Sequence, residues 1–457
     1  MRFRRAYALV FLAVATLQGC VSFTPYQPAP TEADLVIRNA TIVGAGTESV
    51  RENVDIAVMD SRIVAITEHP SPYIGIQTID ATGRYVIPGL IDAHTHPFPI
   101  ERSFSQFMHY GVMTILVTGC SLCTNERMAA LRALGKDNME VAPRVFHTSQ
   151  HVTMEGRHPV KTYPTPNWVE GSTVFYLRDR EDIAPLIARL ADDPIVGIKL
   201  TIEKGPIPPF VEPISEAFVT EVVSQAHARN VKVYAHVSDI AGAEVANRAG
   251  VDHLLHFTGV TLDWDQHAAM IEGFVDRDLH WVTTLMIDKS FLYPLNPDWI
   301  MRARDTSLFD EELDRFAATG MSIEGARRAA QMIYGEPDPV FAKNPLLQQQ
   351  FDNLLWLHKS GIKLVTGTDV GNRYILPGFS LHEEMELLEL GGFKPLEILK
   401  MATINAAELI DADDSLGSVE IGKIADLVVL ARDPRSSIAH LRDIDMVIKG
   451  GNPLPIH

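Results

Sequence analysis

The sequence predicts a parallel (β/α)₈ barrel of the TIM type, joined to a small β-sandwich that both ends of the chain form. Through residues 89–412, apolar strand-like runs alternate with helical stretches. Short β signals fill residues 34–88 and return in 413–457. At 457 residues the chain exceeds the size at which one compact core usually stops growing, which favours a large domain with a smaller partner.

Residues 1–20 are typical of a bacterial lipoprotein signal peptide. A basic head precedes the apolar run 8–17, which is too short to span a bilayer, and the following LQGC resembles a lipobox. We expect a lipidated Cys20 to be the mature N-terminus of an exported protein of the cell envelope, on the outer-membrane or periplasmic side in a Gram-negative host. An unprocessed anchor or a plain secretory signal remains the alternative.

Residues 21–33 contain three prolines and predict an extended tether between the anchor and the folded body. The lipid would be the only contact with the membrane. The formal net charge of −18 makes nucleic-acid binding unfavourable.

The two terminal β segments predict one discontinuous sheet domain. Residues 34–88 contain DLVIRNATIV, VDIAVMDSRIVAI and IQTIDATGRYVIPG. In these runs apolar residues alternate with other residues, and Gly, Asn and Asp interrupt the runs, as in a small antiparallel sandwich. Similar signals, LGSVEIGKIADLVVLA and DMVIKGG, lie within 413–457.

The middle of the chain predicts eight strands in chain order. They end near the paired histidines of DAHTH and in MTILVTG, RVFHTSQ, IVGIKLT, VKVYAHV, DHLLHFTG, WVTTLM and KLVTGTD. Helical patterns such as EDIAPLIARLADD separate them, which favours a barrel over an open sheet. The connection over about 288–358 is long, and we expect it to contain extra helices near the barrel mouth.

Cys120 and Cys123 form a C-x-x-C pair. In an exported protein, oxidising conditions favour a disulfide, with two buried thiols as the alternative. A zinc knuckle would need a second pair of ligands nearby, and the sequence shows none.

The strongest chemical signal is VIPGLIDAHTHPFP. His94 and His96 are two residues apart at the end of an apolar strand, so both rings point to one face. Barrel enzymes place catalytic groups at the carboxyl ends of their strands, and paired imidazoles are natural ligands for zinc or a similar ion.

Four further candidates lie at corresponding strand ends: Lys199 in GIKL, His236 in VYAH, His256 in DHLLH and Asp369 in GTD. Each histidine alone could be an ordinary polar residue. A lysine facing a barrel interior is harder to explain, because an unpaired buried ammonium is costly. Together with His94 and His96 they predict a metal site.

These motifs resemble those of the amidohydrolase superfamily, in particular its binuclear branch with prolidase-like dipeptidases and imidazolonepropionase-related proteins. The resemblance covers nearly everything after the tether. It includes PGLIDAHTH, GIKL, YAHVSD, DHLLHF, GTDVG, SLHEEMELLELGGFKPLEILKMATINAAELI and LGSVEIGKIADLVVL.

The resemblance implies two divalent metal ions, with zinc expected. His94 and His96 would bind one ion with Asp369 beside it, and His236 and His256 would bind the other. Lys199, as a carbamate made with CO₂, would bridge the pair.

The implied chemistry is hydrolysis. Two adjacent cations lower the pKa of a shared water, so that hydroxide exists near neutral pH, and one cation polarises the scissile carbonyl. Asp369 would take the proton of the hydroxide and return it to the departing amine.

Three further residues are candidates for substrate contacts. Tyr234 is two residues before His236 and could donate to a developing oxyanion, or it could be a core residue of the barrel. His158, in EGRHP, aligns loosely with the histidine of a Gly-Gly-His-Gly motif in relatives, and the differing sequence puts this role in doubt. Arg373 could bind a substrate carboxylate or form a surface salt bridge.

The sequence thus favours hydrolysis of an amide or peptide-like C–N bond in a small-molecule or dipeptide-like substrate, with a dipeptidase or an N-acyl amino acid hydrolase as candidates. A lactonase, esterase or phosphotriesterase with the same site is the alternative. A mononuclear deaminase or imidazolonepropionase fits less well, because those relatives do not use a bridging lysine. A non-catalytic scaffold would be expected to lose metal ligands, and none is lost here. The oligomeric state stays open, a homo-oligomer included.

Overall fold

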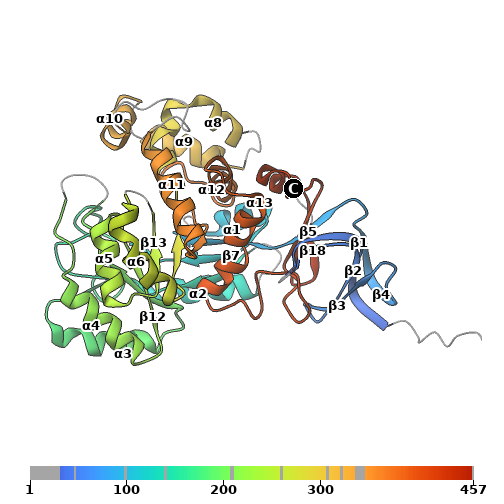
Figure 1. Cartoon of the computed structure of the whole chain (residues 1–457), viewed down its shortest axis with the longest axis horizontal. Coiled ribbons are helices and arrows are strands. Elements are labelled where there is room, and N and C mark those ends of the chain that lie inside the picture. The colour runs from blue at the N-terminus through green and yellow to red at the C-terminus, as the bar shows by residue number, and fades with distance from the viewer. Residues whose placement is uncertain are drawn as a thin grey trace, which may run out of the picture.

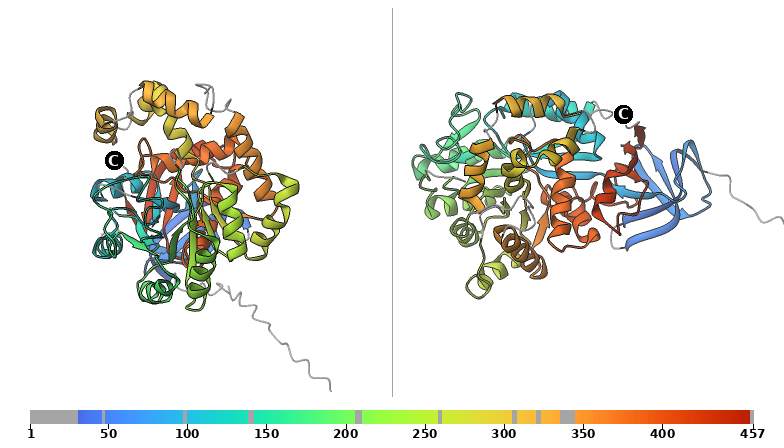
Figure 2. Two further views of the ribbon diagram at one scale, coloured as in Figure 1. Left: turned by 90° about the vertical axis from the view of Figure 1, so that its left-hand side faces the viewer. Right: turned by 90° about the horizontal axis from the view of Figure 1, so that it is seen from above.

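A computed structural model of the chain describes residues 31–45, 48–96, 100–137, 142–205, 210–257, 261–304, 308–319, 323–334 and 345–454. Figure 1 shows a body of strands and surrounding helices with a smaller body of strands at one end. The second panel of Figure 2, seen from above, confirms that the smaller body lies at one end of the larger one.

The smaller body is an eight-stranded sheet built from both ends of the chain, with the order β18-β17-β16-β5-β1-β2-β3 and β4 paired to β1. Its strands are β1 (Thr31–Ala45), β2 (Glu48–Met59), β3 (Arg62–Glu68), β4 (Tyr73–Asp80), β5 (Tyr85–Pro88), β16 (Leu427–Leu430), β17 (Ile444–Lys449) and β18 (Asn452–Leu454).

The pairing within this sheet is mixed, so the expectation of a purely antiparallel sandwich is wrong. The long strand β1 pairs in parallel with both β4 and β5, and antiparallel with β2. Its register against β2 shifts around Asn39, which adopts a φ of +54°. Such a bulge bends a strand, and here β1 contacts β4 along one part of its length and β5 further on.

The larger body is the predicted barrel. Its strands are β6 (Leu90–Thr95), β7 (Val112–Val117), β8 (Arg144–His147), β11 (Gly197–Thr201), β12 (Lys232–His236), β13 (His253–Leu255), β14 (His280–Val282) and β15 (Lys363–Val365). All eight strands that the sequence predicted are present. The short β9 (His151–Thr153) continues the third strand and pairs with β11, and β10 (Val174–Tyr176) pairs with β9.

The parallel strands form a seven-stranded and a three-stranded sheet, and backbone contacts join the two. The amide of Val196 donates to the carbonyl of His147 on one side. A parallel bridge between Thr95 and Val370 closes the other side. These contacts complete the (β/α)₈ barrel.

Helices cover the outside of the strands. They are α1 (Ile100–His109), α2 (Asn125–Asp137), η1 (Arg180–Asp182), α3 (Ile183–Ala191), α4 (Glu216–His227), α5 (Ile240–Ala249), α6 (Trp264–Asp276), α12 (Phe379–Leu390), α13 (Pro395–Met401), α14 (Ile404–Leu409) and η4 (Ile438–Arg442). The spacing of apolar residues explains how they pack: α3 buries Ile183, Ile187 and Leu190, which share one helical face.

The long connection after β14 contains extra helices, as the sequence predicted: α7 (Met286–Leu292), η2 (Tyr293–Leu295), α8 (Pro297–Arg304), α9 (Asp310–Thr319), α10 (Ile323–Tyr334) and α11 (Pro345–Lys359). Figure 1 shows α8, α9 and α10 together at the top of the view. A buried ion pair of 2.6 Å between Lys289 and Glu383 fastens this group to α12. The Tyr293 ring also stacks on Tyr374, with centroids 5.6 Å apart.

A buried charge network joins the sheet domain to the barrel. Asp426 accepts from Arg144 of β8 at 2.8 Å and from Lys449 of β17 at 3.1 Å. The fully buried Lys449 ammonium also donates to the carbonyl of Met113 in β7 at 2.6 Å. Arg144 is the first residue of β8 and Met113 is the second residue of β7, so the sheet domain contacts the amino ends of barrel strands.

Cys20 and most of the predicted tether lie outside the described residues. Thr31 already belongs to β1, so the first strand begins three residues before the predicted boundary. Within the described ranges, every helix is too short or too polar to cross a bilayer.

Candidate metal centre

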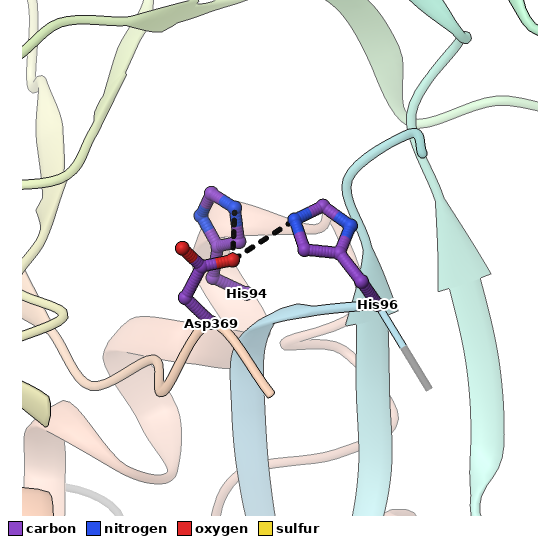
Figure 3. Close-up of side chains that lie close together, drawn as sticks. All are labelled: His94, His96 and Asp369. Atoms are coloured by element: carbon purple, nitrogen blue, oxygen red, sulfur yellow. Dashed lines mark ion pairs between the residues drawn. The ribbon is translucent and has the colours of Figure 1, made fainter. Parts of the chain in front are cut away.

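His94, His96 and Asp369 come together at the carboxyl end of the barrel (Figure 3). His94 is in β6 and is fully buried, whereas the His96 side chain is 21% exposed. The Nε2 atoms of His96 and His94 lie 2.9 and 3.6 Å from Oδ1 of Asp369. Asp369 follows β15 with a φ of +62°, and its amide donates to the carbonyl of His94 at 2.8 Å, which fixes the carboxylate beside the two rings.

His236 and His256 form a second pair beside the first. His236 ends β12, and His256 follows β13 with a φ of +74°. Nδ1 of His236 lies 3.1 Å from Nε2 of His256. The His256 ring is also 4.3 Å from the His94 ring, centroid to centroid, so the two groups are neighbours.

Lys199 lies in β11 and is completely buried. Its Nζ atom has no hydrogen-bond partner within the described part of the chain. Burial lowers the pKa of this ammonium to about 7, and the neighbouring carboxylates Asp369 and Glu203 oppose the shift only in part. A substantial fraction of Lys199 is therefore a neutral amine at physiological pH.

The side chains fit a pair of divalent ions. Burial, reinforced by the nearby positive charge of Lys199, lowers the pKa of His94 and of His236 well below the ordinary value, so both rings are neutral and keep a lone pair. Neither ring nitrogen of His94 has a hydrogen-bond partner in the described ranges. Zinc–nitrogen bonds of about 2.0–2.1 Å place two ligand atoms of a tetrahedral ion roughly 3.3 Å apart. The distances above, 2.9 to 3.6 Å, match this spacing.

Glu203 is a member of the site that the sequence interpretation missed. It lies two residues beyond β11, is 5% exposed, and its carboxylate contacts Nε2 of the neutral His236 ring. A carboxylate in this place accepts a hydrogen bond from Nε2–H and leaves Nδ1 free to face His256, which is how outer partners orient metal-binding histidines. Glu203 could also bind an ion itself with His236 and His158, but the Nδ1 geometry favours the orienting role. Its alternation with Lys199 and Thr201 on one strand face was the available signal.

Two more buried polar residues support the site without having been predicted. Asp92, two residues before His94, accepts from the hydroxyl and the amide of Thr368 at 2.7 and 3.0 Å, and so fastens β6 to the loop of Asp369. Burial raises the pKa of Asp92 to about 7. His151 lies opposite Lys199 in register, and its Nδ1 is 2.9 Å from the hydroxyl of Thr201.

His158 lies beside His236, and its role in the reaction stays a prediction. Its ring is 5.1 Å from that of His236, it is 2% exposed, and its Nδ1 is 2.6 Å from the hydroxyl of Thr162. Arg373 is exposed in the loop after Asp369, and its contact with a substrate stays a prediction.

The oxyanion role of Tyr234 is wrong. The hydroxyl donates a hydrogen bond to the carbonyl of Leu409, and the ring packs 4.8 Å from His253. Nearby negative charges at Asp411 and Asp252 add to burial in raising the pKa of Tyr234 well above its ordinary value. Asp411 also pairs with Lys232, the first residue of β12, so the tyrosine side chain runs toward the amino end of the barrel. The position of its backbone on the inward face was correct, but the direction of the long side chain could not be deduced from alternation.

Cys120 and Cys123 form the expected disulfide, with an S–S distance of 2.05 Å. The loop that contains it follows β7, and the amide of Cys123 donates to the carbonyl of Cys120 at 3.0 Å. The Gln150 side chain donates to the carbonyl of Cys123 at 3.1 Å.

Comparisons with solved structures agree with the fold. An Xaa-Pro dipeptidase crystallised with methionine in its active site superposes with a TM-score of 0.68 at 20% identity, over 92% of this chain and 99% of that one. A putative prolidase from Bifidobacterium longum gives a TM-score of 0.65 at 24% identity, over 92% and 94% of the two chains.

A curated relative, the adenine deaminase of Geobacillus kaustophilus, is 43% identical over 93 residues. That match covers 19% of this chain and only 15% of the length of the deaminase. The model of the Amidohydrolase family matches residues 85–454, which include the whole barrel and the C-terminal strands. The chain therefore belongs to the Amidohydrolase family.

Proposed function

We propose that the chain is a metal-dependent hydrolase that cleaves an amide or peptide-like C–N bond. The observation that supports this most directly is the convergence of four imidazoles, one carboxylate and a lysine amine that has no hydrogen-bond partner among the described residues, at the ends of five barrel strands. Such a cluster would be costly to bury in a purely structural role, because several of its polar atoms lack hydrogen-bond partners in the described ranges.

In this proposal His94, His96 and Asp369 would hold one divalent ion, with zinc expected, and His236 and His256 would hold the other. Lys199, as a carbamate formed from CO₂, would serve as a further ligand for the pair. Only the neutral amine reacts with CO₂, and the pKa of about 7 makes that form abundant. The carbamate replaces a positive charge by a negative one where two cations would otherwise be repelled.

The ions would lower the pKa of water and polarise the scissile carbonyl. Asp369 is the residue that handles the proton. Burial raises the pKa of its carboxyl group, but the hydrogen bond with His96 and the nearby positive groups outweigh this effect and leave the pKa below its ordinary value. Asp369 is therefore ionised, accepts the proton of the attacking water, and delivers it to the nitrogen of the departing amine as the C–N bond breaks.

Dipeptides and N-acyl amino acids are the substrates that we propose first. The similar structures named as an Xaa-Pro dipeptidase and a putative prolidase support this choice. Arg373, near Asp369 in sequence, would bind the free carboxylate. The same site could hydrolyse a lactone, an ester or a phosphotriester, so these compounds form the competing class.

The test is metal analysis of the purified full chain followed by a hydrolysis screen of dipeptides, N-acyl amino acids, lactones and phosphotriesters on the zinc-loaded protein. About two metal ions per chain and selective cleavage of the amides are expected. Arg373→Ala should raise KM for substrates with a carboxylate more than for their amides, and equal effects on both would remove Arg373 from the carboxylate site. A protein that binds no transition metal would contradict the whole proposal.

We also propose that the chain is exported and anchored to the membrane by a lipid on Cys20. The basic head, the short apolar run and the LQGC motif support this proposal.

A further inference from the structure

A cavity of about 200 Å³ lies against the metal centre, on the side of β7. His96 and Gly371 form the wall that it shares with the site, and the Cys120–Cys123 disulfide forms another wall. The His96 side chain keeps 21% of its surface exposed, whereas that of His94 is fully buried. A substrate held at the metal centre therefore has a cavity immediately beside its reacting bond.

The rest of the lining is mainly apolar: Val117, Leu122, Met128 and Leu131, of which all but Leu122 are at most 2% exposed. Ser121 and Arg127 are the polar residues of the lining apart from His96. No aspartate or glutamate occurs among the described lining residues. A group with a positive charge would thus enter a mainly apolar space, and no described lining residue is a carboxylate that could compensate for its lost hydration.

The walls of this cavity are held in place. Met128 and Leu131 belong to α2, and their side chains are part of the main hydrophobic core. The disulfide fixes the loop between β7 and α2, and the side-chain amide of Gln150 binds the Cys123 carbonyl. A cavity with fixed walls discriminates between ligands by size, because the walls do not collapse around a smaller group.

We propose that this cavity is the specificity pocket of the enzyme and that it binds an uncharged apolar group next to the scissile bond, of the size of a leucine or phenylalanine side chain. An apolar cavity of about 150 Å³ is large enough for a benzene ring. The inference rests on the proposed amide hydrolysis, and it adds the class of substrate that the site selects. It also gives the disulfide a function, which is to shape one wall of the pocket.

Two ligand series test the proposal, with N-acetylglycine common to both. One series varies the amino acid, as N-acetyl-glycine, -leucine, -phenylalanine and -lysine. The other varies the acyl group on glycine, as acetyl, isovaleryl and phenylacetyl. Binding to the zinc-loaded full chain is measured by calorimetry, and kcat/KM is measured wherever hydrolysis occurs. In one of the two series, affinity should rise at least about tenfold from the smallest to the leucine-sized group, because about tenfold is the lower limit for even one added methylene in a fitted pocket. If the amino-acid series is the responsive one, the lysine derivative should bind more weakly than the leucine derivative.

Variants of the lining then locate the effect. Leu122→Trp, in the half-buried loop, fills the cavity and should reduce the affinity ratio between large and small groups about tenfold. Leu131→Ala enlarges the cavity and should move the preference toward the phenyl group. Leu134→Ala removes a partly buried leucine from the same helix, outside the lining, and should leave the ratio unchanged. Thermal unfolding of each variant shows that it is folded.

A flat affinity profile in both series, or a ratio that Leu122→Trp does not change, would overturn the pocket assignment. Because binding and turnover are measured separately, the two proposals fail separately. Size-dependent binding without any hydrolysis would refute amide cleavage and keep the pocket, whereas hydrolysis without size dependence would refute the pocket alone.

Discussion

Replacing Lys199 by methionine should stabilise the metal-free protein while removing its activity. Methionine has a similar length and no charge, so it fills the same space in the barrel. The Lys199 amine is fully buried without a hydrogen-bond partner in the described part of the chain. Folding therefore removes its hydrogen bonds to water, and no protein group replaces them among the described residues.

The expected gain follows from the pKa. In the unfolded chain Lys199 has its ordinary pKa of 10.5, and in the folded protein burial lowers this to about 7. Between these two pH values the unfolded state binds a proton that the folded state does not, so folding becomes more favourable as pH rises. At about 1.36 kcal/mol per pKa unit, the cost to the wild type is about 4 kcal/mol at pH 7 and about 1 kcal/mol at pH 10.

Urea unfolding of the chelator-treated wild type and Lys199→Met, in buffer free of CO₂, measures this difference at both pH values. Lys449→Met is the matched control, because Lys449 is equally buried but has Asp426 and the Met113 carbonyl as partners. That variant should lose stability at pH 7, since it breaks a buried ion pair. The reasoning is refuted if Lys199→Met is no more stable than the wild type at pH 7, or if its advantage is as large at pH 10.

Zinc titration should also show loss of paired ion binding in Lys199→Met and in Lys199→Arg, because neither side chain forms the carbamate.

Three further predictions concern other parts of the chain. Glu203→Gln should weaken zinc binding about 10- to 100-fold in competition with a chelator, because the partner that orients His236 is weakened; unchanged affinity would contradict the orienting role. Tyr234→Phe should leave kcat and KM unchanged and lower the free energy of unfolding by about 1 kcal/mol, since only the hydrogen bond to Leu409 is lost; a large fall in kcat would restore the tyrosine to the reaction. Cys20→Ser should release the protein from the membrane fraction, and unchanged fractionation would count against a lipid anchor.

Sequence reasoning was most successful where local spacing determines the result. The alternation in DAHTH placed His94 on the inward face of β6, with His96 directly beyond the strand. The candidate ligands at the predicted strand ends lie at the same end of the barrel. Parallel strands in a closed barrel leave little freedom about where their carboxyl ends meet. The six candidate ligands could therefore be named before any distance was known.

The errors have a common physical origin, since each depends on contacts between segments that are distant in sequence. Tyr234 occupies the predicted strand, but its hydroxyl finds a carbonyl 175 residues further along the chain. Glu203 was absent from the sequence interpretation, and its place in the site depends on contacts with His236 and His158. The parallel pairing of β1 with β4 and β5 likewise depends on which strands become neighbours, which alternation within a strand does not specify.

The buried network around Asp426 determines the orientation of the barrel relative to the sheet domain. It fastens the sheet domain to the amino ends of barrel strands, so the metal centre opens at the opposite end from the domain that contains the first described strand. Any surface, bead or fusion partner attached ahead of Thr31 would thus be linked to the enzyme at the end opposite the metal centre, so the catalytic opening would face away from it. Immobilising the protein through its N-terminal side should preserve turnover, whereas coupling through side chains around the mouth should obstruct access to it.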